Sequence, residues 1–284
     1  VYAFLNGRQL RTFLQSDKYV DKYIAVSDNA GRYAIGRLGI DKEKVVTIPN
    51  GLDLEEHKRR ERQAPNVFRT DFGLFKEDYV LLNVASYNLH KGHYLMADAM
   101  KKILEVRDDI KILCIGNVVF PPHVEGLKAY LKEEKLDRHI IMPGFYPNVE
   151  SFYKMADAFL QPSFIEGWSI AMNEAMFYGK PMILTRTGGA PEVIEGNDIG
   201  ILIDNEYGDI LNLDSTLLDS MAYKQRSFKT STALAQAMLK FGNNKEHWKE
   251  AGMKGRRKLM EQYDLRQIVK RYEDIFIKVA FSRN

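Results

Sequence analysis

The stretch FIEGWSIAMNEAMFYGKPMILTRTGGAPE, residues 164–192, decides the fold of this 284-residue chain. Before it, residues 158–162 (AFLQP) predict a short buried strand. From Ser169 onward, apolar residues surround most of the circumference of a predicted helix, and such a helix lies inside a protein. At its start, free backbone N–H groups and the positive end of the helix dipole form a natural seat for a phosphate.

Two carboxylates flank this predicted helix start. Glu166 lies in the loop before the helix, and Glu174 lies within the helix among apolar residues. Because an ionised carboxylate is rarely buried without a partner, Glu174 needs one. Two acids around a phosphate seat suit a ligand that has both anionic and hydroxyl parts.

Strands and helices alternate on both sides of this stretch. Strands are predicted at residues 79–85, 110–115, 139–142, 158–162, 182–185 and 200–203. Intervening helical patterns predict an α/β fold with a Rossmann-like parallel sheet, which binds ligands beyond the carboxyl ends of its strands. We therefore expect one crevice to be formed by the loops at 86–92, 116–121, 143–148, 163–169 and 186–191.

The two ends of the chain carry their own patterns. Residues 22–26, 28–38 and 44–48 predict a strand, a helix and a second strand, followed by the turn Pro-Asn-Gly-Leu-Asp at 49–53. From Ser227 onward the chain is predicted to be helical. The last helix carries one apolar stripe, formed by Ile268, Tyr272, Ile275, Phe276 and Val279. Periodicity alone does not decide whether this stripe packs on residues 1–50 or on its own domain.

A run of motifs resembles a known family. Glu166 and Glu174 are separated by seven residues and are followed by Glu-Ala-Met, Gly-x-Pro, Gly-Gly-x-x-Glu and Gly-Ile-Leu-Ile, the last at 200–203. In this order the motifs resemble those of the GT-B glycosyltransferases, specifically retaining family 4 (glycosyl transferases group 1). The resemblance implies a GT-B type of sheet, with only the tail of the N-terminal domain present.

The resemblance also implies a division of the chain. Residues 1–53 would be a remnant of an acceptor-side domain with its hinge, and the charged residues 54–76, which include Pro65, a linker. Residues 77–265 would bind the nucleotide sugar, with an insertion at 204–226, and residues 266–284 would cross back. Because the chain begins with Val1 and enters an apolar, helix-like segment directly, we expect a fragment or a trimmed chain.

The matching positions are expected to form the site. Lys91 and Glu166 take the catalytic roles, with Lys91 neutralising the leaving diphosphate and Glu166 contacting the donor sugar. Donor contacts are expected from Ser86, Phe145, Tyr146, Gly167, Trp168, Ser169, Ile170 and Glu174, the last on the ribose hydroxyls. Phe145 or Tyr146 would lie against the base, although core packing explains an aromatic residue there equally well.

One position departs from the family pattern. The family usually carries an arginine five residues before the phosphate-binding lysine, where this chain has Ser86. One cationic clamp on the leaving group is then either missing or supplied from elsewhere, with His90 and Arg186 as candidates. His90 and His93 have no cysteine, aspartate or further histidine nearby in sequence, and no Asp-x-Asp is present, so we expect no metal and no cofactor besides the donor substrate.

Composition narrows the functional class. The net charge of +3 and pI near 8.7 argue against a nucleic-acid binder, and no Gly-x-Gly-x-x-Gly or P-loop sequence supports a dehydrogenase or a kinase. Cys114 is the single cysteine, which fits a reducing compartment. We expect a cytoplasmic protein. The basic clusters at 58–62 and 254–258 leave open a peripheral membrane contact, although interspersed acids favour solvated faces.

The predicted function is transfer of a sugar from a nucleoside diphosphate-sugar to an acceptor hydroxyl with retention of configuration. The acceptor could be a glycan, a lipid or a protein. Two alternatives stay open: a nucleotide-sugar-binding module without turnover, and a GT-B epimerase acting on a nucleotide sugar. The module is favoured by Ser86 and by the incomplete acceptor half.

Overall fold

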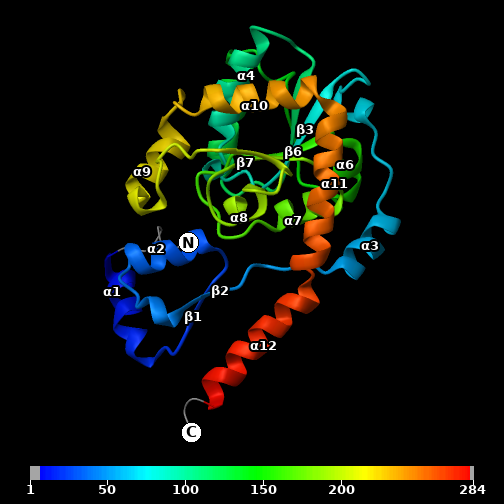
Figure 1. The fold of residues 1–284 in the computed structure, drawn as a ribbon. Helices are drawn as coiled ribbons and strands as arrows, with labels where there is room; N and C mark the ends of the chain where they lie inside the picture. Colours follow the sequence, from blue (N-terminus) through cyan, green and yellow to red (C-terminus); the bar gives the residue numbers. More distant parts are fainter. Residues whose placement is uncertain (1–6, 282–284) are drawn as a thin grey trace.

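A computed structural model describes residues 7–281 (Figure 1), so the helix-like segment expected at the very start of the chain lies outside the described residues. Within 7–281, six strands form one parallel sheet, the large sheet, in the order β5-β4-β3-β6-β7-β8. Its strands are β3 (Tyr79–Val84), β4 (Ile110–Ile115), β5 (Ile140–Gly144), β6 (Ala158–Gln161), β7 (Met182–Thr185) and β8 (Gly200–Ile203). The expected α/β fold with a Rossmann-like parallel sheet is confirmed.

Helices cover both faces of the large sheet. One face packs against α4 (His93–Leu104), α5 (Pro121–Glu133) and α10 (Ser231–Asn243). The other packs against α6 (Glu150–Met155), α7 (Ile170–Phe177), the short α8 (Ala190–Ile194) and the end of α11 (Lys245–Gln262). Successive strand residues point to opposite faces, so Leu81 joins the first core and Leu82 the second. Central strands are therefore apolar along nearly their whole length, which is why the sequence predicts them well.

The single cysteine lies in this sheet. Cys114 on β4 is fully buried in the first core and forms no disulfide. Burial raises the pKa of its thiol to about 12, because the apolar surroundings disfavour the thiolate.

The N-terminal part forms a smaller unit. After α1 (Gly7–Ser16), β1 (Tyr23–Ala25) and β2 (Val45–Thr47) pair in parallel as a small sheet, connected by α2 (Asp28–Gly36). Ser27 caps α2, since its side chain accepts a hydrogen bond from the Ala30 amide at 3.1 Å. The predicted strand, helix and strand are all present.

Residues 54–76, expected to be a linker, are folded. They include α3 (Leu54–Gln63) and a 3-10 turn, η4 (Arg69–Phe72). Asp53 caps α3 by accepting from the Glu56 amide at 2.9 Å. The many charged residues of this segment were the reason to expect a linker. In the structure they form ion pairs one helical turn apart on α3, such as Lys58 with Glu55 at 2.8 Å.

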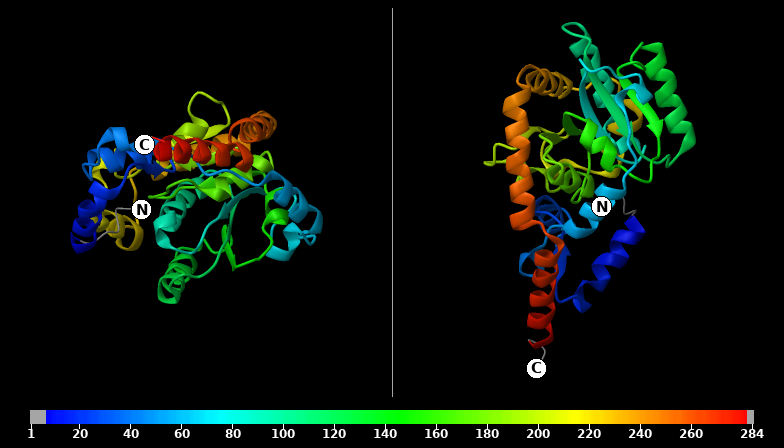
Figure 2. Two further views of the ribbon diagram at one scale, coloured as in Figure 1. Left: turned by 90° about the horizontal axis from the view of Figure 1, so that it is seen from below. Right: turned by 90° about the vertical axis from the view of Figure 1, so that its right-hand side faces the viewer.

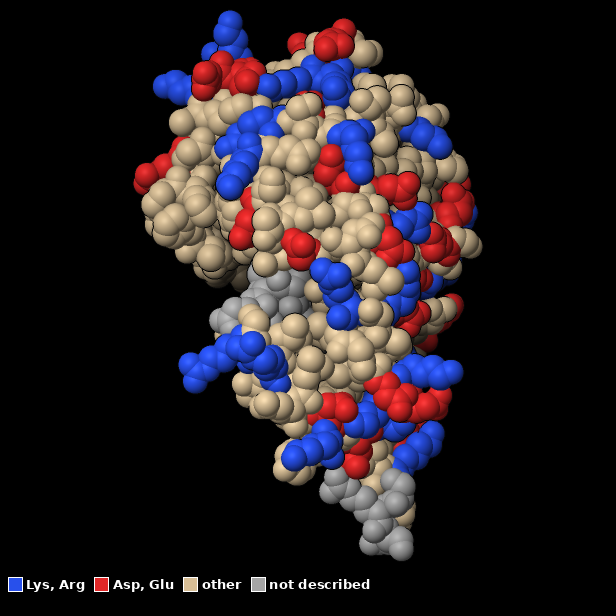
Figure 3. Space-filling model, turned by 90° about the vertical axis from the view of Figure 1, so that its left-hand side faces the viewer, with Lys and Arg blue, Asp and Glu red and all other residues tan. Residues whose placement is uncertain are grey.

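Most of the basic cluster at 58–62 is neutralised by acids. Arg59 contacts Glu56 at 2.6 Å, and Arg60 contacts Glu150 at 2.6 Å. On the face drawn in Figure 3, lysines and arginines lie beside aspartates and glutamates along the right-hand edge and near the bottom, whereas much of the remaining surface is uncharged. Within residues 7–281, no helix has both the length and the apolar character that a membrane span requires.

The last helix runs back to the N-terminal unit. α12 (Leu265–Phe281) extends from the end of α11 and passes along the small sheet (Figure 1, Figure 2). The guanidinium of Arg271 donates to the carbonyl of Thr47 on β2 at 2.9 Å. Ile275 and Phe276 of the predicted stripe line a hollow together with Ile24 of β1. The stripe therefore faces the N-terminal residues, although Phe276 keeps 63% of its surface exposed.

Candidate functional site

The site lies where strands of the large sheet end. The lysine loop (86–92) follows β3, the acidic loop (163–169) follows β6, and residues 186–189 follow β7. Lys91 donates to Oε1 of Glu166 at 2.7 Å, and the hydroxyl of Ser163 donates to the same oxygen at 2.8 Å. The structure thus brings together the two side chains predicted to be catalytic.

Close backbone contact holds the lysine and acidic loops together. The Phe164 amide donates to the His90 carbonyl at 2.9 Å. Gly92 has a φ of +78°, and a Cβ there would lie 2.0 Å from the carbonyl oxygen of Pro162. Only glycine permits this conformation at this distance, so Gly92 fixes how near Lys91 comes to Glu166.

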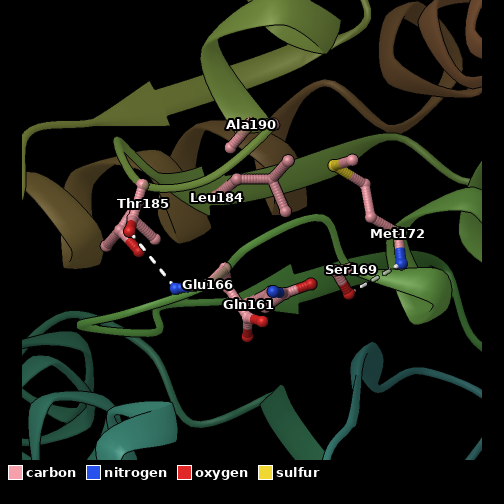
Figure 4. Close-up of a pocket in the computed structure, with 9 residues that line it drawn as sticks. Gln161, Glu166, Ser169, Met172, Leu184, Thr185 and Ala190 are labelled. Atoms are coloured by element: carbon pink, nitrogen blue, oxygen red, sulfur yellow. Dashed lines mark hydrogen bonds between the residues drawn. The ribbon is translucent and has the colours of Figure 1, made fainter. Parts of the chain in front are cut away.

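Residues 186–189 close the other side of the acidic loop. The Glu166 amide donates to the hydroxyl of Thr187 at 3.3 Å, and a Cβ on Gly188 would lie 2.4 Å from the Gly167 carbonyl oxygen. A small hollow lies between residues 186–189 and the acidic loop (Figure 4). It is lined by Gln161, Glu166, Ser169, Met172, Leu184, Thr185, Thr187, Gly189 and Ala190. The free space that it offers a ligand is about 10 Å³, far below the roughly 300–1,000 Å³ of ordinary ligand pockets.

The start of α7 borders this hollow. Ser169 caps the helix by accepting from the Met172 amide at 3.2 Å, and both residues line the hollow. Glu166, in the loop before the helix, pairs with Lys91. Ile170, the first residue of the helix, is 44% exposed. A cation, a carboxylate and a helix N-terminus therefore meet within one loop cluster.

Trp168 has a structural position. Its side chain is buried, with its ring centroid 4.9 Å from that of Tyr263. Its indole N–H donates to Oδ1 of Asn173 at 3.0 Å. The side-chain Nδ2 of Asn173 in turn donates to the Asn50 backbone carbonyl at 2.9 Å. Its side chain thus links the acidic loop to the turn at 49–53, and the donor contact expected of Trp168 stays a prediction.

Glu174 contacts residues of α3 and α6. Its Oε1 lies 3.3 Å from Nε2 of His57 on α3, and its Oε2 accepts from the Tyr153 hydroxyl at 3.0 Å. The expectation that this carboxylate needs a partner is confirmed. The residues lining the Glu166 hollow do not include Glu174, so the two predicted acids do not share it.

The surroundings of His57, the histidine beside Glu174, raise its pKa. Burial acts to lower the pKa of His57, but the Glu174 carboxylate and the Asp53 carbonyl outweigh it, so the pKa is raised above its ordinary value. His57 therefore holds its proton to higher pH than a solvated histidine does.

The two aromatic residues expected at the base differ in environment. Phe145 is 67% exposed after β5. Tyr146 packs into the second core, with its ring centroid 4.8 Å from that of Phe152 and 6.0 Å from that of Phe72. Phe145 is therefore accessible from solvent, whereas Tyr146 packs mainly in the second core.

The two cations suggested to replace the arginine missing at Ser86 have other partners. Nε2 of His90 lies 3.2 Å from Asp219, and burial lowers the pKa of His90 more than that carboxylate raises it. Arg186 contacts Asp204 at 2.9 Å and also pairs with Glu195. Neither is oriented toward Lys91 by these contacts, so Lys91 is the cation that the structure places beside Glu166.

The predicted insertion joins distant parts of the molecule. It contains η6 (Ile210–Asn212), α9 (Ser215–Asp219) and the π-helical η7 (Ser220–Lys224). Asp209 pairs with Arg32 of α2 at 2.7 Å, while Asp219 reaches His90 in the lysine loop. Residues 204–226 therefore connect the N-terminal unit with the lysine loop.

Sequence reasoning missed several residues around the two acids. Ser163 lies three positions before Glu166 in the same loop. A hydroxyl so near in sequence could have been predicted to contact the carboxylate. Thr187 lies in a loop that was predicted to join the crevice. No local pattern marks His57 or Tyr153, because each approaches Glu174 only through the packing of α3 and α6 on α7.

Comparison with known families matches the part of the chain that contains Lys91, Glu166 and Glu174. A family model described as "Glycosyl transferases group 1" matches residues 66–222, more than half of the chain. An N-acetyl-alpha-D-glucosaminyl L-malate synthase from Bacillus anthracis is 24% identical over 235 residues, covering 83% of this chain and 54% of that protein. Spore coat protein SA from Bacillus subtilis (strain 168) is 27% identical over 236 residues, covering 77% of this chain and 61% of its own length. The chain spans little more than half the length of these curated relatives.

Solved structures share the fold. Anabaena HepE, solved in complex with UDP and glucose, superposes with a TM-score of 0.76 at 16% identity, covering 96% of this chain and 67% of that one. A sucrose-phosphate synthase from Thermosynechococcus elongatus superposes with a TM-score of 0.73 at 17% identity, covering 100% of this chain and 64% of that one. At these identities the likeness shows the fold alone.

Proposed function

The chain belongs to the glycosyl transferases group 1 family, and on this premise we propose that it binds a nucleoside diphosphate-sugar and transfers the sugar to an acceptor hydroxyl with retention of configuration, as retaining family 4 enzymes do. The acceptor would be a glycan, a lipid or a protein. HepE was solved with UDP and glucose, so a UDP-sugar is the first donor to test.

The observation that carries this proposal is the contact of Lys91 with Glu166. In the proposed mechanism the diphosphate enters between the two loops and takes the Lys91 ammonium from Glu166. The freed carboxylate then accepts a hydrogen bond from a sugar hydroxyl. This exchange would also enlarge the small hollow beside Glu166.

Charge development explains why these groups would speed the reaction. Breaking the bond between the sugar and the diphosphate builds negative charge on the leaving group. Lys91 would neutralise that charge, together with the backbone N–H groups near Ser169 at the start of α7. Because these groups supply the positive charge, we propose that the donor requires no metal ion. Donor binding that is lost on chelation with EDTA would contradict this part.

Glu174 would add the contact to the ribose of the nucleotide. Each of its oxygens already contacts one protein group, at His57 and Tyr153, but a carboxylate oxygen can accept two hydrogen bonds. We propose that the remaining lone pairs accept the ribose hydroxyls of the nucleotide.

Calorimetry on the chain tests donor binding. UDP, GDP and ADP are titrated separately, followed by the sugar conjugates of whichever binds, and the anomeric configuration of a transferred sugar is read by NMR with the full-length protein. We expect one nucleoside diphosphate to bind more tightly than the others. Binding of none of the three would contradict the proposal, and a product of inverted configuration would contradict retention.

Ser86 favours a second candidate, a nucleotide-sugar-binding module without turnover. With serine in place of the usual arginine, and with His90 and Arg186 engaged by acids, the leaving group has fewer cations near it. Donor binding without hydrolysis or transfer by the full-length protein would favour the module. Formation of an epimerised nucleotide sugar would instead favour a GT-B epimerase.

A further inference from the structure

Helix α3 brings a histidine into contact with a buried carboxylate of α7. Nδ1 of His57 lies 3.0 Å from the carbonyl oxygen of Asp53, and Nε2 lies 3.3 Å from Oε1 of Glu174. A carbonyl oxygen and an ionised carboxylate can only accept hydrogen bonds. Both ring nitrogens must then donate, which requires the doubly protonated, positively charged imidazolium.

The pair is shielded from water. The side chain of His57 is 9% exposed and that of Glu174 is 12% exposed. The imidazole ring also lies against the ring of Phe177 on α7, with 5.8 Å between the centroids. In such surroundings an opposite charge at contact distance governs where a carboxylate points, because few water molecules compete for it.

Other groups around the pair do not replace this cation. From α6, the Tyr153 hydroxyl donates to the second oxygen of Glu174, and burial raises the pKa of this phenol well above its ordinary value, so it stays neutral. Glu150, also on α6, is paired with Arg60 of α3. Tyr178, after α7, stacks on Tyr153 with 5.3 Å between the centroids.

The charged neighbours on α3 itself face other groups. Glu56 is paired with Arg59, and Arg60 is committed to Glu150. Electrostatically, Arg60 disfavours the charged form of His57, whereas Glu174 favours it. Helix α3 thus supplies one cation to each of two buried carboxylates, His57 to Glu174 and Arg60 to Glu150.

We propose that His57 is a positioning residue, whose imidazolium orients the Glu174 carboxylate so that its remaining lone pairs meet the ribose hydroxyls of a nucleoside diphosphate. This inference rests on the proposed function. It assigns to α3, in a segment that the sequence marks only as charged, control over nucleotide affinity.

A pH profile follows from the geometry. At low pH the imidazolium donates to Glu174 and fixes it. As pH rises through the raised pKa of His57, Nε2 loses its proton and presents a lone pair to the carboxylate. The contact then becomes repulsive, Glu174 is less well oriented, and nucleotide affinity falls.

Calorimetry from pH 6 to 9 tests the assignment with UDP, GDP and ADP on the unmodified chain and on His57→Gln and His57→Phe. For the nucleotide that binds, we expect the dissociation constant of the unmodified chain to rise several-fold over this range. His57→Gln keeps a donor that does not titrate, so its dissociation constant should not show this rise. His57→Phe should bind about tenfold more weakly at pH 6 and should also lack this rise. His247→Gln, on an exposed histidine of α11, serves as the matched control and should keep the slope.

Inorganic pyrophosphate separates positioning from general damage, because it lacks a ribose. Its affinity should be unchanged in both His57 variants, whereas misfolding would weaken it together with the nucleotide. Equal pH slopes in the unmodified chain and in His57→Gln, or a parallel loss of pyrophosphate binding in both variants, would overturn the inference while leaving the proposed function intact. Absence of binding by every nucleotide to the unmodified chain would instead contradict the proposed function, and the inference with it.

Discussion

The ammonium of Lys91 lies 2.7 Å from Oε1 of Glu166, although 75 positions separate the two residues in the chain. The contact joins the end of β3 to the end of β6, neighbouring strands of the large sheet. Each charge balances the other, so a diphosphate that enters must compete with Glu166 for Lys91. Donor affinity should therefore depend on how readily this ion pair opens.

Replacing Lys91 by methionine should weaken nucleoside diphosphate binding by about 10- to 100-fold, the cost of losing one charge-assisted hydrogen bond. Methionine keeps much of the side-chain volume but carries no charge. Calorimetry with the nucleoside diphosphate measures the loss, and the corresponding nucleoside, which has no phosphate, should bind both proteins alike. Equal losses for nucleoside and diphosphate would show that Lys91 does not act on the phosphates.

Asn173→Ala should lower the free energy of unfolding by about 2–4 kcal/mol. The substitution removes the partner of the buried indole N–H of Trp168 and of the half-buried carbonyl of Asn50. Urea denaturation measures the change. Asn117→Ala, at an exposed position after β4, is the control and should stay within about 0.5 kcal/mol. Similar stabilities for the two variants would mean that this network contributes little.

Gly92→Ala should destabilise the chain by roughly 2–4 kcal/mol. The new Cβ would lie 2.0 Å from the carbonyl oxygen of Pro162, in a backbone conformation that side chains disfavour. Gly126 on α5 provides the opposite case, because nothing lies within 4 Å of a Cβ there. Gly126→Ala should stabilise the chain by about 0.5–1 kcal/mol. Thermal unfolding that shows no difference between the two would refute the assigned contact.

Glu192→Gln should raise Tm at pH 8 and leave it nearly unchanged at pH 5. Burial raises the pKa of Glu192 to about 7, and its Oε1 accepts from the Asp28 amide at 2.9 Å, joining α8 to α2. A carboxyl whose pKa is higher in the folded than in the unfolded state stabilises the fold when protonated. That stability is fully present below the unfolded pKa and is lost as pH rises through about 7.

Glutamine keeps the acceptor oxygen but does not ionise, so the variant should lack this part of the pH dependence. Scanning calorimetry between pH 5 and 8 measures it. Glu133→Gln, on an exposed face of α5, is the matched control and should follow the unmodified chain. A Glu192→Gln profile parallel to that of the unmodified chain would show that Glu192 is not the group responsible.

Much of the fold could be predicted because its signals are local. Each strand of the large sheet is a short apolar run, and those predicted at 110–115, 182–185 and 200–203 have the observed bounds of β4, β7 and β8. Loops at the carboxyl ends of parallel strands converge by geometry, so the meeting of Lys91 with Glu166 also followed.

The rest depends on contacts between distant segments. The sequence predicts that Glu174 has a partner but not which residue it is. The partner His57 lies 117 positions away, on a helix within the segment that was expected to be a linker. The packing of the Trp168 side chain on Tyr263, which follows α11, likewise joins segments that are distant in the sequence. Such pairings are fixed by packing and leave no periodic trace in the sequence.

The burial of Cys114 in β4 has a practical consequence. Maleimide dyes react with thiolates, and this thiol is both inaccessible and strongly disposed to keep its proton. A cysteine introduced at an exposed position of α2 or α12 would therefore be the one that takes up a fluorophore, with no native thiol to remove first. With a second introduced cysteine on an exposed position of α5 to carry the acceptor dye, the distance from the N-terminal unit to α5 could be followed by energy transfer as nucleotide is added.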